Sequence, residues 1–253
     1  MSWAAGQLWA AGYREWLPPA GLRGSLACLW VSVVPAGGGP SVTQVLPDGC
    51  VDLIWQSGYG AYVAGPDTGP MPAELPAGTI VVAARFHPGA GGPALGLPLT
   101  DLLNMRVDLA DCLPGLASRL PADLPPAIAL DLVTGLSAQL VSDGPPDPLV
   151  IQGTRLLARG STSVRQLSTE LAVSERQLRR RFDAAVGYGP KTLHRVIRFR
   201  QVLAQLSAAP HHADLAWLAA QAGYADQAHL TRETTRLAGL PPAALAKTFA
   251  TMG

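Results

Sequence analysis

Two stretches near the C-terminus decide the fold, and they share one pattern. The first reads SVRQLSTELAVSERQLRRRF over residues 163–182, and the second reads DLAWLAAQAGYADQAHLTR over residues 214–232. Each stretch has a short amphipathic segment, a tight turn and a second amphipathic segment. A helix, a turn and a second helix with arginine on its outer face is the layout that places side chains in a DNA major groove. Two copies predict contacts with two successive grooves on one face of the duplex.

Serine and aspartate residues mark the expected starts of these helices. Ser163 and Ser174 are each followed three residues later by glutamine, which fits the capping box. Asp214 and Asp226 occupy the matching positions in the second stretch, where a carboxylate suits the positive end of a helix. The sequence therefore predicts a defined start for all four helices.

Leucine and phenylalanine give the second helix of the first stretch an apolar back. Leu178 and Phe182 are four residues apart and so lie on one face. At about 100° per residue, Arg176 and Arg180 fall on the opposite face, with Arg179 at its edge. A solvated basic face on an ordinary helical hairpin is the alternative, but two copies of the pattern favour DNA binding.

The two second helices are expected to contribute unequally to DNA recognition. The first carries more arginine, and an arginine paired to guanine contributes about 1–3 kcal/mol of base discrimination. Arg181 projects toward the inner flank of its helix, so we expect it to meet a phosphate or a neighbouring acid. The first unit should therefore dominate sequence preference.

Charge divides the chain in the same place as the motif. Residues 1–147 hold five Arg and twelve Asp or Glu, a net charge of −7. Residues 148–253 hold fourteen Lys or Arg and six Asp or Glu, a net charge of +8. A basic module gains affinity for phosphates through counterion release. The net charge of the whole chain is nearly zero, but its C-terminal part is basic, which suits binding to double-stranded DNA.

At these residues the chain resembles the AraC/XylS family of transcription regulators. The resemblance covers about residues 148–253 and includes the turns at 187–190, 223–227 and 239–242. It implies an operator in double-stranded DNA as the partner. It also implies DNA contacts at Arg176, Gln177, Arg179, Arg180, Gln227, Ala228, Thr231 and Arg232.

The chain departs from the family pattern at two positions. Ala172 stands where the family usually has a turn glycine, which predicts some backbone strain. Thr234 stands where the family usually has a core phenylalanine, four residues after Leu230. The second unit should therefore have a thinner core than the first.

The N-terminal half resembles a sensor-like region that is attached to some members of this family. The matching segments are PDGCVDLIW at 47–55, AGPDT at 64–68 and RFHPG at 85–89. The resemblance implies a domain type, and the effector remains unidentified. A small-molecule effector of this domain is expected.

The remaining patterns predict an α+β protein of two domains. Residues 1–143 are expected to form a β-rich barrel or sandwich with helices, used for effector binding or dimerisation. Apolar runs at 26–34, 51–55 and 79–83 are separated by Gly and Pro, as in short strands, whereas 101–141 looks helical. The breakers in residues 141–148 suggest a linker. Residues 148–253 are expected to form an all-α domain with two helix-turn-helix units.

Polar residues within apolar segments are the candidate ligand contacts. These are Asp52, Trp55, Arg85 and His87, which could line a pocket together with Asp48. The alternative is structural: Asp48 caps a turn, and Asp52 pairs with Arg85. Strand alternation also places Asp52 and Trp55 on opposite faces. Five tryptophans precede residue 56, namely Trp3, Trp9, Trp16, Trp30 and Trp55, and core filling is favoured for them.

An enzyme is the less favoured class. Residues 1–147 contain one histidine, so a multi-histidine metal site cannot be built from them, and neither a metal nor a cofactor is expected. The cysteines Cys28, Cys50 and Cys112 show no paired spacing, so a zinc site with His87 is disfavoured and reduced thiols are the default. The chain has neither a long apolar run nor a basic start typical of a signal peptide, so a cytoplasmic location without membrane insertion is expected.

The sequence thus predicts a DNA-binding transcription regulator that responds to a small molecule and forms a homodimer. The apolar stripe of Leu130, Val133, Leu136 and Leu140 is a candidate dimer face, although packing on its own barrel is an equal alternative. Two other functions stay open. One is a constitutive dimeric regulator whose N-terminal half only dimerises, and the other is a catalytic or thiol-based sensor.

Overall fold

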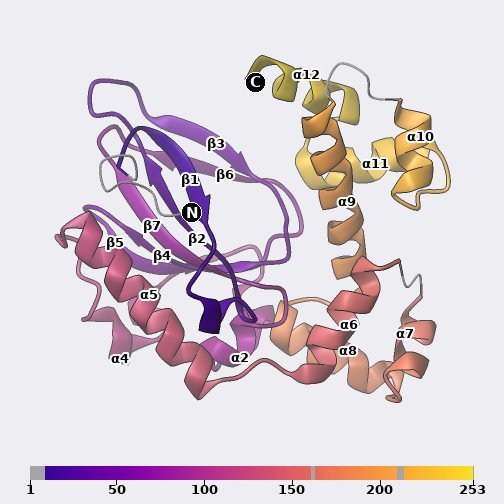
Figure 1. Cartoon of the computed structure of the whole chain (residues 1–253), viewed down its shortest axis with the longest axis horizontal. Helices are drawn as coiled ribbons and strands as arrows, with labels where there is room; N and C mark the ends of the chain where they lie inside the picture. The colour runs from indigo at the N-terminus through magenta and orange to yellow at the C-terminus, as the bar shows by residue number, and fades with distance from the viewer. Residues whose placement is uncertain (1–8, 161–162, 210–213, 253) are drawn as a thin grey trace.

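The computed structural model describes residues 9–160, 163–209 and 214–252. Trp3 and the N-terminal start lie outside these residues. A β-rich N-terminal domain precedes a helical C-terminal domain, and the two lie side by side (Figure 1). This arrangement confirms the predicted α+β fold of two different halves.

Within residues 9–160, a six-stranded antiparallel sheet and a two-stranded sheet form the N-terminal domain. The large sheet has the order β1 (Gly12–Trp16), β2 (Leu26–Val33), β7 (Ile80–Phe86), β4 (Val51–Gln56), β5 (Gly60–Ala64) and β8 (Arg106–Asp108). The small sheet pairs β3 (Ser41–Val45) with β6 (Met71–Leu75). The three predicted apolar runs correspond to β2, β4 and β7.

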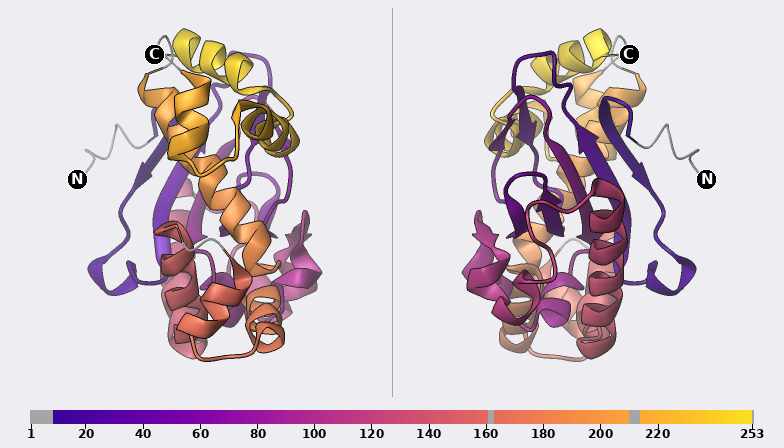
Figure 2. Two further views of the ribbon diagram at one scale, coloured as in Figure 1. Left: turned by 90° about the vertical axis from the view of Figure 1, so that its right-hand side faces the viewer. Right: turned by 90° about the vertical axis from the view of Figure 1, so that its left-hand side faces the viewer.

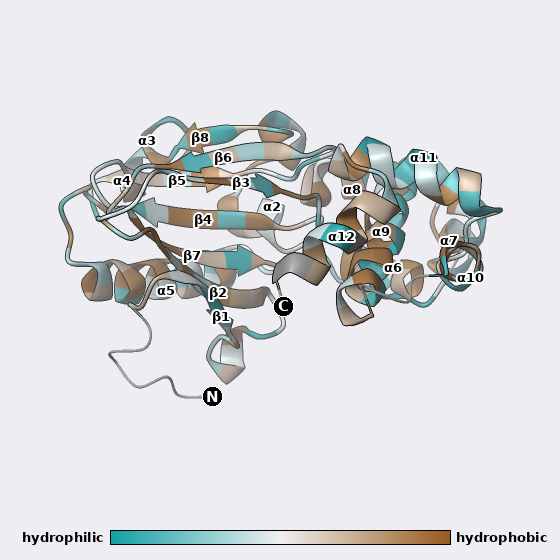
Figure 3. Ribbon diagram, turned by 90° about the horizontal axis from the view of Figure 1, so that it is seen from above, coloured by the Kyte–Doolittle hydropathy of each residue, from teal (hydrophilic) through white to brown (hydrophobic). Residues whose placement is uncertain are grey.

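One face of the large sheet packs against the long helix α5 (Pro126–Asp143). Val133 and Leu136 of this helix are fully buried, with Leu53 and Trp55 of the sheet in the same cluster. The helix stripe that was a candidate dimer face is therefore covered by the chain's own sheet, because the sheet would otherwise expose its apolar side. In Figure 3 this sheet is largely brown, with teal segments in β4 and β7.

Short elements connect the strands and the long helix. They are η1 (Ala20–Leu22), α2 (Gly91–Leu95), η2 (Leu99–Leu102), α3 (Leu109–Cys112) and α4 (Pro114–Ala117). The region 101–141 was expected to be helical, but it also contains β8, which pairs with β5. Asn104 adopts a left-handed conformation with φ of 57°, and the turn there redirects the chain along the sheet edge.

The C-terminal domain consists of helices joined by short turns. They are α6 (Pro148–Ala158), α7 (Val164–Glu170), α8 (Glu175–Val186), α9 (Pro190–Ala208), α10 (Leu215–Gln221), α11 (Gln227–Ala238) and α12 (Pro242–Met252). The predicted helix-turn-helix units are α7–α8 and α10–α11. Helix α9 runs from one unit to the other, as the side views in Figure 2 show. Only residues 144–147 separate α5 from α6.

All four predicted helix starts are capped as expected. The hydroxyls of Ser163 and Ser174 accept hydrogen bonds from the third backbone N–H that follows, and Ser174 forms a complete capping box. The carboxylates of Asp214 and Asp226 accept from backbone N–H groups of α10 and α11. Each cap satisfies donors that a helix start leaves free.

Glycine allows the two domains to meet at backbone distance. A Cβ on Gly92 of α2 would lie 2.6 Å from the Ala184 carbonyl oxygen of α8. A Cβ on Gly187, which follows α8, would lie 2.6 Å from Cγ of Pro66. From the N-terminal domain, Leu46 and Leu103 pack against the core of the C-terminal domain. Helix α8, the second helix of the first unit and its expected recognition helix, is thus docked on the N-terminal domain.

The two departures from the family pattern have the expected structural effects. Ala172, in the α7–α8 turn, has φ of 54°, whereas Gly223 in the α10–α11 turn has φ of 71°. Thr234 is fully buried on α11, and its hydroxyl has no hydrogen-bond partner among the described residues. A buried hydroxyl without a partner costs about 1–3 kcal/mol. The second unit therefore has a weaker core at this position.

Replacing Ala172 by glycine should stabilise the protein. We expect Ala172→Gly to raise the free energy of unfolding by roughly 0.5–1 kcal/mol, since the strain it relieves exceeds the entropy cost of glycine. The matched change Gly223→Ala should lower it by a similar amount. The nearest described atom to its new Cβ is Cδ of Arg198 at 3.9 Å, so backbone strain alone is tested. Urea unfolding measures the free energy of unfolding of both variants. A lower value for Ala172→Gly than for the unmodified protein would show that the backbone at Ala172 is not strained.

Candidate functional site

Helix α8 presents arginine to solvent and buries an apolar back. Leu178 and Phe182 are fully buried against the other helices of the domain. Arg176, Arg179 and Arg180 are exposed on the other side. Burial of the back fixes the helix rotation, so the guanidinium groups project outward as the helical spacing predicts.

Several of these polar side chains already have intramolecular partners. The side-chain oxygen of Gln177 accepts hydrogen bonds from the backbone N–H and the hydroxyl of Ser174, so it closes the helix start. Arg179 pairs with Asp183 one turn later at 3.6 Å. Arg176 and Arg180 are thus the exposed arginines among the predicted contacts on α8 for which no intramolecular ion pair is found among the described residues.

Arg181 pairs with an acid on the neighbouring helix. Its Nη1 lies 2.9 Å from Oδ2 of Asp147, the residue that caps α6. The sequence predicted a phosphate or a neighbouring acid as its partner, and the structure shows the acid. The contact ties α8 to the segment that joins the two domains.

The second recognition helix, α11, presents a smaller and less charged face. Gln227, Ala228 and Arg232 are exposed, whereas Thr231 is half-buried. The Thr231 hydroxyl donates to the Gln227 carbonyl oxygen of its own helix. Arg232 is thus the one cation among the four predicted contacts on this helix.

Ion pairing and stacking fix the second unit on α9. The guanidinium of Arg195 forms a bidentate pair with the carboxylate of Glu233 on α11. Arg198 donates to the Gly223 carbonyl oxygen and stacks over the Tyr224 ring at 4.5 Å. These contacts set the second recognition helix relative to the first.

A hollow of about 760 Å³ is lined by the end of α6, by α9 and by the second helix-turn-helix unit. The sequence analysis did not predict the basic residues of this hollow as a site. The signal that could have indicated them is the basic character of the segment that forms α9. Burial and the nearby Arg198 lower the pKa of His194, so this lining residue favours its neutral form. The basic side chains that line the hollow are Arg159, Lys191, His194, Arg195, Arg198 and His229.

A second candidate site is a cavity of about 350 Å³ between the two β-sheets. Its floor is the face of the large sheet opposite α5, and the β3–β6 sheet covers it. Neighbouring strands place Trp30 beside Ala83, and Ala83 beside Ile54, which faces Tyr62. This row gives the cavity an apolar and aromatic middle.

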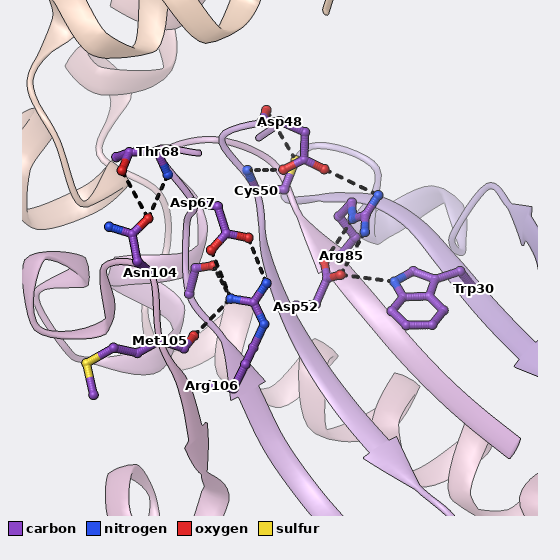
Figure 4. Close-up of polar contacts among 11 residues, drawn as sticks. Trp30, Asp48, Cys50, Asp52, Asp67, Thr68, Arg85, Asn104, Met105 and Arg106 are labelled. Carbon is purple, nitrogen blue, oxygen red and sulfur yellow. Dashed lines mark hydrogen bonds and ion pairs between the residues drawn. The ribbon is translucent and has the colours of Figure 1, made fainter. Parts of the chain in front are cut away.

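Charged residues occupy one end of the cavity. Arg85 pairs with both carboxylate oxygens of Asp52 at 2.8 and 2.9 Å, and with Asp48 at 3.3 Å. Arg106 pairs with both oxygens of Asp67 at 2.7 and 3.0 Å. Figure 4 shows these two clusters on adjacent strands and loops.

The structure brings together part of the predicted ligand set. Asp52 and Arg85 line the cavity. Trp55 is fully buried on the opposite face, where its indole N–H donates to the Pro121 carbonyl oxygen, as strand alternation required. His87 does not line the cavity, and burial lowers its pKa. Contrary to the prediction, neither Trp55 nor His87 lines this cavity.

The structural roles that were the alternative for these residues are also present. Asp48 caps its own turn by accepting from the Cys50 backbone N–H, and Asp52 forms the expected pair with Arg85. Sequence reasoning did not single out Tyr13, Tyr62, Asp67 or Arg106 as lining residues. Tyr13, Tyr62 and Arg106 lie on strands far apart in the sequence, and Asp67 follows the strand of Tyr62, so only the sheet order brings all four together.

The cysteines have the properties of protonated thiols. Burial raises the pKa of Cys28 to about 12 and the pKa of Cys50 well above its ordinary value. In the described part of the chain the three cysteines are free. No cluster of three or more His, Cys, Asp or Glu suited to a metal ion occurs among the described residues. None of the described helices is long and apolar enough to cross a membrane.

Comparisons with known proteins match each half of the chain separately. Residues 14–108 match a domain of unknown function, DUF6597, and residues 167–248 match a helix-turn-helix domain. A comparison with curated proteins finds no match.

Among solved structures, the fold is similar to the crystal structure of ToxT from Vibrio cholerae O395. The TM-score is 0.46 at 9% identity, covering 87% of this chain and 96% of ToxT. ToxT of strain SCE256 with a bound unsaturated fatty acid gives 0.43 at 11% identity, covering 88% and 95%. The capped helices and the matched sequence agree that the C-terminal part of this chain contains a helix-turn-helix domain, preceded by a DUF6597 domain.

Proposed function

We propose that this protein is a sequence-specific transcription regulator that binds operator DNA through both helix-turn-helix units. The observation that carries this proposal is the exposed pair Arg176 and Arg180 on α8, held outward by the buried Leu178 and Phe182. The net charge of +8 on residues 148–253 supports affinity for phosphates. The second unit adds a less charged contact surface through α11.

The cavity between the sheets supports an effector role for the N-terminal domain. Its volume lies at the lower end of the range for small-molecule sites, about 300–1,000 Å³. Its polar end is formed by loops that also contact the first helix-turn-helix unit. A constitutive regulator would need neither feature. The raised pKa values of the cysteine thiols disfavour a thiolate-based sensor.

Homodimerisation stays a prediction, and the surface first considered for it is not available. The apolar face of α5 packs on the large sheet, so a dimer has to use another surface. Sedimentation of the full chain at tens of micromolar, roughly the range where a useful dimer persists, tests this. A monomer under those conditions would contradict it.

Removing an arginine from α8 should relax base preference more than removing one from α11. We expect Arg176→Ala or Arg180→Ala to cost about 1–3 kcal/mol of discrimination at its base pair, because arginine contacts guanine with two hydrogen bonds. Arg232→Ala should change preference less. Arg200→Ala, an exposed position on α9, is the control for loss of charge. Sequencing of duplexes selected from a random library measures preference, and equal effects in all variants would contradict unequal roles.

DNA affinity should fall steeply with salt. Each phosphate contact contributes a slope of about −0.9 in log affinity against log salt. Several such contacts predict a loss of more than about tenfold between 50 and 200 mM KCl. Fluorescence anisotropy with the full chain is suitable, since Leu46 and Leu103 of the N-terminal domain help to complete the C-terminal core. Affinity that does not change with salt would reject the basic surface as the binding site.

A further inference from the structure

The cavity between the sheets has the size and lining for a small molecule with an apolar body. Its volume is about 350 Å³, and its lining combines Trp30 and Tyr62 with the aliphatic Ile54, Leu75 and Val81. The face of the large sheet toward the cavity forms its own small apolar cluster, separate from the core under α5. Aromatic faces of this kind attract an apolar body and also a cation.

The charges at the polar end favour one class of head group. Three carboxylates line it, on Asp48, Asp52 and Asp67, against two guanidinium groups on Arg85 and Arg106. Both arginines already make bidentate pairs with aspartate, so neither is a vacant anion site. An incoming carboxylate would add a fourth negative charge in a partly desolvated space. A cationic donor would instead neutralise the excess carboxylate.

A tyrosine of the DNA-binding domain lies behind this polar end. Tyr188, between α8 and α9, is 6% exposed, and its hydroxyl has no hydrogen-bond partner among the described residues. The hydroxyl would lie 3.4 Å from a Cβ on Gly49, the residue between Asp48 and Cys50. Burial raises the pKa of Tyr188, and Asp48, Cys50 and Asp67 raise it further. The unpaired Tyr188 hydroxyl therefore faces the turn that carries the Asp48 carboxylate.

The loops at the polar end are packed directly on α9 and on the turn that joins α8 to α9. A Cβ on Gly49 would lie 2.9 Å from Cδ1 of Leu193 on α9. Pro66, beside Asp67, packs on Gly187 at the end of α8. A ligand that displaces the Gly49 turn therefore changes the contacts of α9, and one that displaces the Pro66 loop changes those at the end of α8, because close packing leaves no space to absorb the shift.

We propose that the cavity binds a small amphipathic cation, such as an amine on an aromatic body, and that the Tyr188 hydroxyl conveys its presence to the first recognition helix. The ammonium group binds at the carboxylate of Asp48, which has only the 3.3 Å contact with Arg85, and the body lies along Trp30 and Tyr62. Movement of the Asp48 turn changes the surroundings of the unpaired Tyr188 hydroxyl. This inference rests on the proposed function for its DNA read-out, whereas ligand binding is tested without DNA.

Three probes with one body test the ligand class on the full chain. Calorimetry with 3-phenylpropylamine, 3-phenylpropanol and 3-phenylpropionate compares a cation, a neutral molecule and an anion of nearly equal size. We expect the amine to bind at least about tenfold more tightly than the acid. Tighter or equal binding of the acid, or no saturable binding of the amine at about 10 mM, near the weak limit for small fragments, rejects the class.

A charge-removing variant locates the head group. Asp48→Asn keeps the side-chain oxygen that accepts from the Cys50 backbone N–H, but it removes the charge. We expect the affinity for the amine to fall about tenfold or more. Glu74→Gln is the control, because Glu74 is exposed on β6, whereas its neighbours Ala73 and Leu75 line the cavity. Equal affinity in both variants would place the ammonium group elsewhere and overturn the proposed site.

Removing one hydroxyl tests the coupling. The measured quantity is the ratio of operator affinities with and without saturating amine, for which we expect at least about fivefold in the unmodified protein. In Tyr188→Phe the ratio should fall toward one while the amine still binds. Tyr224→Phe is the matched control, since its hydroxyl is also buried and unpaired among the described residues, but Tyr224 lies in the second unit, with its ring beneath Arg198.

The outcomes of these experiments separate the two proposals. The role of Tyr188 is overturned if the affinity ratio in Tyr188→Phe equals that of the unmodified protein. It is also overturned if the ratio falls as much in Tyr224→Phe as in Tyr188→Phe. A ratio of one in the unmodified protein that binds both amine and operator also overturns it. Absence of operator binding under every condition refutes the proposed function instead, and calorimetry with the amine still decides the ligand class.

Discussion

Backbone contact between α2 and α8 is the constraint on which the rest of the structure depends. Gly92 lies against the backbone of Ala184 and Ala185, so closely that a Cβ would lie 2.6 and 2.9 Å from their atoms. Gly187 provides a second close approach, to Pro66 and Leu99. Contacts of this kind leave no room for side chains, so the relative position of the two domains is set by backbone geometry.

Because of this docking, helix α8 has one exposed surface and one surface in contact with the N-terminal domain. The exposed side of α8 carries Arg176 and Arg180, whereas its C-terminal end packs on the N-terminal domain. Of the loops that close the polar end of the cavity, the one with Pro66 touches Gly187 at this end of α8, and the one with Gly49 touches Tyr188 and Leu193 just beyond it. A change in the cavity therefore has a short physical route to the recognition helix, through packed groups and not through a flexible linker.

The sequence predicted the elements whose signals are local. Helix caps such as Ser174, the apolar back formed by Leu178 and Phe182, and the strained turn at Ala172 were all expected, because each depends on residues within one helical turn. The cavity could be predicted only in part. Asp52 and Arg85 stood out as charges in apolar runs, and alternation already separated Trp55 from Asp52.

What the sequence did not predict depends on sheet order and domain docking. Tyr13, Tyr62 and Arg106 reach the cavity from strands whose pairing is not encoded in their spacing. The turn that the Tyr188 hydroxyl faces lies far away in the sequence, at Gly49, so no local pattern predicts that the two lie close together. Likewise, the stripe of α5 had two possible uses, and only the fold decides between them.

Calorimetric unfolding of Gly92→Ala tests most directly whether the two domains form one unit. The unmodified protein should unfold in a single cooperative transition, and Gly92→Ala should split it in two, because the new Cβ collides with the α8 backbone. Gly115→Ala is the control, since its Cβ would meet no described atom within 4 Å. Two transitions in the unmodified protein, or a Gly92→Ala variant that unfolds like Gly115→Ala, would contradict the account.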